Sequence, residues 1–92
     1  MSRRVAVFDS NTLCDSVIVR SVRPGDKFFP LGLNGNKKLS DFLIDEKYPA
    51  ILRGGVIVVE SNGEIIWVVG MRTGEYCKVV KQTKSAVIMN FL

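Results

Sequence analysis

Four cationic side chains lie beside two glycine-containing turns and the only clear helix start of the chain: Arg20, Arg23, Lys37 and Lys38. Guanidinium groups match phosphate oxygens in pairs, and ammonium groups attract them as point charges. Free backbone N–H groups at a helix start also bind anions. This segment therefore has the chemistry needed to hold a phosphate backbone.

Each of these cations also has an ordinary structural explanation. Lys37 and Lys38 could extend into water with Asp41 as a loose partner, although two lysines at a helix start are unfavourable by a few tenths of a kcal/mol each. Arg20 shares a predicted strand face with apolar residues, so it either binds phosphate or pairs with Asp26 or Glu75. Both explanations remain open at this point.

Two further arginines, Arg53 and Arg72, adjoin glycine-rich connections where a backbone could approach a ligand closely. Turn geometry alone also explains those glycines. Aromatic residues such as Phe28, Phe29 and Trp67 could stack on bases, but in so small a chain most of them are expected in the core.

The composition argues against an isolated enzyme. The chain has no histidine, which removes the usual general base and the commonest metal ligand, and it has no Walker or dinucleotide-binding glycine motif. Net charge is +4, and residues 20–53 carry seven cations against four carboxylates, so +3 of it lies in that segment. Such concentration favours a polyanionic partner.

Ninety-two residues form one domain, 1–92. No apolar run approaches the roughly 18 residues of a membrane span, and no signal peptide is recognisable. Cys14 and Cys77 are too few for a zinc knuckle, so we expect reduced thiols packed in a cytoplasmic protein and no bound metal.

The apolar pattern predicts mostly strand with one central helix, an α+β fold. Strands are predicted at residues 5–8, 17–22, 56–60, 65–69, 76–80 and 86–91. Asn62-Gly63 predicts a two-residue type I′ hairpin, and Pro24-Gly25-Asp26 a turn. Residues 28–35 are predicted to fold over the core as an irregular apolar loop.

The helix is predicted from Lys37 or Lys38 to about Lys47. Ser40 is a plausible N-cap, with Leu39 and Ile44 as a hydrophobic staple, and a start at Asn36 is equally defensible. Residues 39, 42 and 43 form its apolar face, and Pro49 ends it.

The order of the motifs resembles a known family, the C-terminal domain of bacterial tRNA(Ile)-lysidine synthetase. The matching segments are residues 20–28 (RSVRPGDKF), 30–32 (PLG), 37–45 (KKLSDFLID), 63–68 (GEIIWV) and 70–72 (GMR). The resemblance extends upstream to residues 7–9 and Leu13, so it covers nearly the whole chain. Leu33 and the stretch around residues 54–57 depart from the pattern of the family.

The resemblance implies a small β-rich, sandwich-like domain with one central helix, related to a domain of a phenylalanyl-tRNA synthetase subunit. It implies a non-catalytic domain that binds the acceptor stem of a tRNA(Ile) with a CAU anticodon, attached to a ligase that joins lysine to the wobble cytidine. ATP, with magnesium, and lysine would be used by the catalytic domain, which this sequence lacks, and no cofactor is expected here.

The resemblance also selects candidate nucleic-acid-binding residues. By position they are Arg20, Arg23, Lys27, Lys37, Lys38, Lys47, Arg53 and Arg72. The alternative is a structural module that packs against its own enzyme or another protein without touching RNA, its charges serving solubility.

Overall fold

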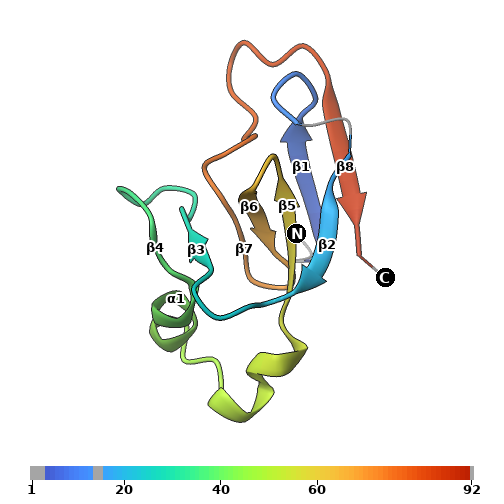
Figure 1. Cartoon of the computed structure of the whole chain (residues 1–92). Coiled ribbons are helices and arrows are strands. Elements are labelled where there is room, and N and C mark those ends of the chain that lie inside the picture. Colours follow the sequence, from blue (N-terminus) through green and yellow to red (C-terminus); the bar gives the residue numbers. More distant parts are fainter. Residues whose placement is uncertain (1–3, 14–15, 92) are drawn as a thin grey trace.

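A central β-sheet with different elements on its two faces organises the chain (Figure 1). The computed structural model describes residues 4–13 and 16–91. Its elements are β1 (Val5–Asp9), β2 (Ile18–Ser21), β3 (Lys27–Phe28), β4 (Lys37–Lys38), α1 (Leu39–Asp45), the 3-10 helix η1 (Ala50–Gly55), β5 (Ile57–Ser61), β6 (Glu64–Val68), β7 (Arg72–Thr73) and β8 (Ala86–Asn90). The expected α+β composition is confirmed.

The strand order of the central sheet is β2-β5-β6-β3-β4, and β7 also pairs with β6. The β5–β6 hairpin forms its centre. Asn62 and Gly63 connect the two strands with φ of 53° and 81°, the positive values that a type I′ turn requires. The predicted hairpin is therefore confirmed.

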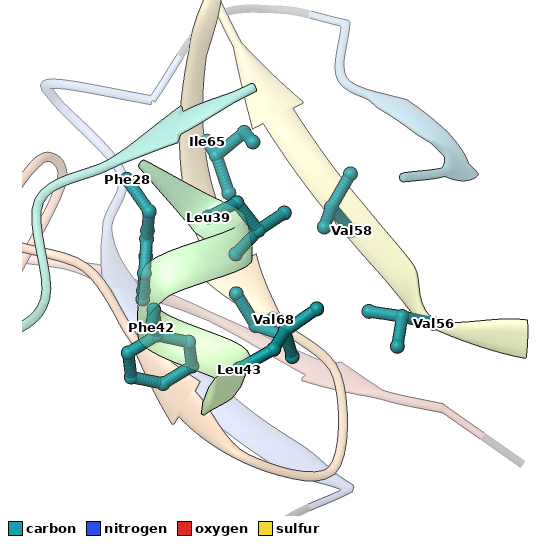
Figure 2. Close-up of a cluster of buried hydrophobic side chains, with 8 residues drawn as sticks. All are labelled: Phe28, Leu39, Phe42, Leu43, Val56, Val58, Ile65 and Val68. Atoms are coloured by element: carbon teal, nitrogen blue, oxygen red, sulfur yellow. The ribbon is translucent and has the colours of Figure 1, made fainter. Parts of the chain in front are cut away.

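Two apolar clusters lie on opposite faces of this sheet. On one face, the helix residues Leu39, Phe42 and Leu43 pack against the valines and isoleucine of β5 and β6 (Figure 2). On the other face, the separate β1–β8 ribbon contributes Phe8, which packs against Trp67. The result is three layers, with α1 and the ribbon separated by the sheet (Figure 1).

A shift in register makes this two-sided packing possible. Val59 pairs with Trp67 while Glu60 pairs with Ile65, so Ile66 is an extra residue in β6. Ile66 and Trp67 then both belong to the cluster under the ribbon, and Ile65 belongs to the cluster under α1.

The predicted helix start was wrong by one or two residues. Lys37 and Lys38 are extended and form β4, and the N-cap Lys38 has φ −62°, ψ 136° and no side-chain capping bond. Pairing with β3 holds both lysines outside the helix, and the Leu39 N–H donates to the Asp26 carbonyl instead. Ser40 is therefore inside the helix.

The predicted hydrophobic staple was also wrong, because Ile44 is 57% exposed. The apolar face of Leu39, Phe42 and Leu43 is confirmed. Lys47 adopts a left-handed φ of 58° just beyond α1, and the Tyr48 N–H returns to the Leu43 carbonyl. The helix thus ends at Asp45, four residues before Pro49.

The strand expected at residues 76–80 does not form. Backbone bonds there go to separate segments: Glu75 N–H donates to Phe29, and the Cys77 carbonyl accepts from Asp9. Cys77 has a φ of 63°, which no extended strand tolerates. The strand that does form in this region is the short β7, which ends four residues before Cys77.

The loop between β3 and β4 does not cover the core as expected. Leu31 and Leu33 are 41% and 43% exposed. The Leu31 N–H is bound to Thr73 and the Leu33 N–H to Pro30, which holds the loop in a turn at the sheet edge.

Among the helices of the described residues, none has the length and apolar character needed to cross a bilayer.

Candidate nucleic-acid interface

A cleft of about 550 Å³ opens where the β2–β3 turn, the start of α1 and η1 meet. Arg23 comes from the turn, Lys38 from the residue before α1, and Arg53 from η1. Leu39 and Leu43, each only 1% exposed, close its floor. Three predicted cations from three separate segments therefore border one concave, apolar-floored site.

The position of Arg23 is fixed by a local turn. Gly25 has a φ of 86°, and the Asp26 N–H donates to the Arg23 carbonyl over 3.2 Å. The Asp26 carboxylate accepts the Arg23 N–H in return over 2.7 Å. The backbone is held at both ends of the turn, while the Arg23 side chain is exposed.

The two-residue ladder between β3 and β4 separates the three lysines of this region. Lys27 pairs with Lys38, so both point to the same side, and both are exposed. Lys37 pairs with the buried Phe28 on the other side and forms an ion pair with Asp45 of α1. Lys27 thus lies beside Lys38 without lining the cleft, whereas Lys37 is directed to the helix.

Arg53 is half-buried at the end of η1. Its Nε is buried and has no hydrogen-bond partner among the described residues. A buried unsatisfied N–H group has a cost of about 1–3 kcal/mol. Arg53 thus borders the cleft with a guanidinium group whose Nε is closed off from solvent.

Arg20 pairs with carboxylates, including Asp26, which was one of the two partners considered for it as the alternative to phosphate binding. Its guanidinium bonds both Asp26 oxygens over 2.9 and 3.0 Å, the Glu60 carboxylate over 2.7 Å and the Ser21 carbonyl over 3.0 Å. The side chain is only 11% exposed. Glu75, the other partner considered, binds Gly32 and Lys78 instead.

This network sets the charge state of Asp26. Burial opposes its ionisation, but the hydrogen bonds from Arg20 and from the Arg23 N–H outweigh burial and lower the pKa of Asp26. The hydrogen bonds that Arg20 donates to Asp26 correspondingly raise the pKa of Arg20. Asp26 lines the cleft, yet its negative charge is balanced by Arg20 behind it.

Arg72 lies on another flank of the sheet. Arg20, Val58, Val68 and Arg72 form one row across β2, β5, β6 and β7. Three strand spacings of roughly 4.8 Å place the backbones of Arg20 and Arg72 about 14 Å apart. Arg72 does not border the cleft, and neither does Lys47, which is exposed beyond the other end of α1.

The sequence analysis did not assign the apolar floor to the site. Leu39 and Leu43 were correctly expected in the core, but only the approach of η1 turns their outer surface into a cleft floor. The aromatic candidates are elsewhere: Phe28 and Trp67 are buried, and Phe29 packs edge-on against Tyr76.

The described residues contain no cluster of three or more potential metal ligands. Cys77 is half-buried and packs beside the cluster under the ribbon, as expected of a packed thiol. The other cysteine, at position 14, lies outside the described residues.

Comparison with known proteins agrees with the motif order. Residues 17–89 match the family described as TilS substrate C-terminal domain. The chain is 39% identical over 87 residues to a tRNA(Ile)-lysidine synthase of Caldanaerobacter subterraneus, covering 95% of the chain and 19% of that protein. A Parabacteroides distasonis tRNA(Ile)-lysidine synthase is 36% identical over 91 residues, covering 99% and 21%. The chain thus spans about a fifth of the length of these relatives.

Solved structures give the same grouping. A crystal structure of a TilS C-terminal domain superimposes with a TM-score of 0.79 at 27% identity, over 96% of this chain and 68% of that one. An N-terminal fragment of the phenylalanyl-tRNA synthetase β-subunit from Pyrococcus horikoshii superimposes with a TM-score of 0.72 at 19% identity, over 91% and 26%. The second likeness concerns the fold alone.

Proposed function

The chain belongs to the TilS substrate C-terminal domain family, and from that premise we propose that it is the tRNA-binding domain of a tRNA(Ile)-lysidine synthase. It would bind the acceptor stem of a tRNA(Ile) with a CAU anticodon, mainly through backbone phosphates. The domain itself is non-catalytic in this proposal. ATP and lysine would react in another domain of the longer cytoplasmic enzyme.

The observation that carries the proposal is the convergence of unpaired cations around one cleft. Arg23, Lys38 and Arg53 line it from separate segments, and Lys27 lies beside Lys38 in the β3–β4 ladder. Over residues 4–13 and 16–91, none of them takes part in an ion pair. The carboxylate that lines the cleft, Asp26, is already paired with Arg20, so gathering these like charges has an electrostatic cost that a polyanion would remove.

The shape of the expected partner fits such a surface. An A-form RNA helix hides its base edges in a deep groove, so proteins recognise its phosphates and its 2′-hydroxyls. Arginine and lysine from several loops suit phosphates spaced along a backbone. Neutralising about three to five phosphates gives a slope near −3 to −4 in a log–log plot of affinity against salt.

The test compares two double variants of equal charge. Replacing Arg23 and Lys38 by alanine removes two cations at the cleft. Replacing Lys81 and Lys84 by alanine removes two exposed cations from the connection before β8, which lies far from α1 and η1 in Figure 1. Binding of tRNA is measured by electrophoretic mobility at several salt concentrations.

The cleft variant is expected to bind tRNA about tenfold more weakly and to reduce the salt slope by about 2. The control variant is expected to change affinity less than about twofold, since it alters only the long-range field. Equal losses in both variants would show that net charge alone drives binding, and the cleft would then not be the interface.

One observation favours the alternative of a protein-interaction module. Ile51 and Leu52 are neighbours in η1 and are 91% and 53% exposed. Adjacent exposed apolar side chains are typical of a surface that contacts another protein. If tRNA mobility is unchanged by the domain at low and at moderate salt, this alternative replaces the tRNA-binding proposal.

A further inference from the structure

The cleft has a feature that phosphate binding alone does not need: depth over an apolar floor. Its volume of about 550 Å³ lies within the range of small-ligand pockets, roughly 300–1,000 Å³. Val22 and Pro24 provide accessible apolar surface above the buried Leu39 and Leu43, and the cations stand around it. A surface that contacted only a sugar–phosphate ridge would have no use for such a recess.

Arg53 is placed to serve a ligand inside the recess. The residue lines the cleft and is only half-buried, so part of its side chain is accessible there. Arginine both donates to phosphate oxygens and offers a flat face on which a base stacks. An apolar surface suits the base and sugar of a nucleotide, and the guanidinium and ammonium groups suit its phosphate. An inorganic anion would leave the apolar surface without a partner.

We propose that this cleft holds one unpaired nucleotide of the bound RNA, its base against Val22 and Pro24 and its phosphate at Arg53 and Lys38. This inference rests on the proposed tRNA binding and extends it from the backbone of the stem to a single-stranded end. Unpaired bases are the parts of an RNA that can be splayed out and packed against a protein. The cations at the rim hold the flanking phosphates.

The absence of aromatic residues from the lining limits the expected gain. Among the described lining residues the base meets aliphatic carbons and guanidinium planes only. Stacking of a base on an aromatic side chain is worth about 5- to 150-fold in affinity, so the lower end applies here. We expect an unpaired extension to tighten binding about fivefold.

Three RNAs distinguish the contribution of the base to affinity from the contribution of the phosphate. The first is a blunt duplex, the second carries a single-stranded 3′ extension, and the third carries the same extension with abasic sugars. The chain is expected to bind the second about fivefold more tightly than the first, and the third no more than about twofold more tightly. A free nucleoside monophosphate, used as a separate probe, is expected to bind far more weakly than the extended RNA.

Two glycines of η1 offer a matched pair of variants. Gly54 lines the cleft and Gly55 does not, and a Cβ at either position meets no atom within 4 Å. Gly54→Trp is expected to remove the gain from the extension. Gly55→Trp is expected to keep that gain. Gly54→Leu provides a milder version of the same obstruction.

The outcomes distinguish this inference from the proposed function. Equal binding of blunt and extended RNA, an equal gain from the abasic extension, or an unchanged gain in both Gly54 variants would overturn the nucleotide pocket and leave stem binding standing. Tight binding of the free monophosphate would overturn it in favour of a soluble ligand. Failure of every RNA to bind would overturn the proposed function itself.

Discussion

Lys27 of β3 and Lys38 of β4 are direct partners across an antiparallel ladder, with both ammonium groups on the exposed side. Like charges in this arrangement repel, and the two-residue ladder has little pairing energy to offset that repulsion. The arrangement makes sense when an anion lies between the two lysines. The repulsion between the two lysines destabilises the free domain, and the proposed binding of RNA would relieve it.

Removing one of these charges should stabilise the free domain. Lys27→Gln is expected to raise the free energy of unfolding by about 0.2–0.5 kcal/mol at low salt, with the difference fading as salt screens the pair. The same change should weaken tRNA binding. Urea denaturation at two salt concentrations measures the first effect, and Lys84→Gln is the control. A lower stability of Lys27→Gln at low salt would contradict the repulsion.

Arg20 is expected to matter for stability more than for RNA. Arg20→Met leaves Asp26 and Glu60, whose side chains are 12% and 13% exposed, without their shared cation. Removal of one member of a largely buried ion pair is strongly destabilising, and the residual exposure reduces the effect here to about 1–3 kcal/mol.

Chemical denaturation measures this loss, and Arg20→Lys provides the comparison. A lysine restores the charge but has no fork for both carboxylates, so an intermediate stability is expected. If Arg20→Lys and Arg20→Met were both as stable as the parent and bound tRNA poorly, Arg20 would be a phosphate ligand after all.

Stability should decrease in acid because of Asp26. Its pKa in the folded state lies below the ordinary value of 3.8, so the unfolded chain takes up a proton at a higher pH than the folded chain does. The contribution of Asp26 is therefore complete above about pH 5 and is lost as the pH falls below 3.8 through its folded value.

The lowered pKa of Glu75, caused mainly by the Gly32 N–H and then by Lys78, acts in the same direction below 4.5. The chain has no histidine, so stability should change little between about pH 5.5 and 7.5. Thermal unfolding across pH 2.5–7.5 tests this profile, with Asp26→Asn as the comparison. A profile of Asp26→Asn as steep as the parent's would assign the acid loss to other groups.

Gly74 is a position where any side chain should be costly. A Cβ there would lie 3.0 Å from Phe28 Cε1 and from the Phe29 carbonyl oxygen, and 3.1 Å from the Ile65 carbonyl oxygen. Two of these neighbours are backbone atoms of the sheet and cannot move aside. Gly74→Ala is expected to lower the free energy of unfolding by about 1–3 kcal/mol.

Gly54→Ala is the control for that variant, because a Cβ at Gly54 meets open space. It should be neutral or slightly stabilising, since alanine restricts the unfolded chain. Denaturant midpoints of the two variants give the comparison. A neutral Gly74→Ala would mean that β3 and β6 can separate at little cost.

Much of the scaffold was predictable because its signals are local. Asn62-Gly63 tolerates positive φ at consecutive positions, so the hairpin follows from two adjacent residues. The apolar face of α1 follows from helical spacing over a few residues. The start of α1 was mistaken because pairing of β4 with β3 overrides the helix preference of Lys37 and Lys38.

The sequence by itself determined the longer strands, the central hairpin, the apolar face of α1, the basic character of the first half and the family to which the chain belongs. Only the tertiary structure decided which cations meet. Arg20 is paired with Glu60 forty residues away, while Arg53 is brought beside Arg23 and Lys38 at the cleft. The physical reason is that charge carries no periodic signal, so the use of each cation depends on the partners that folding brings within about 4 Å of it.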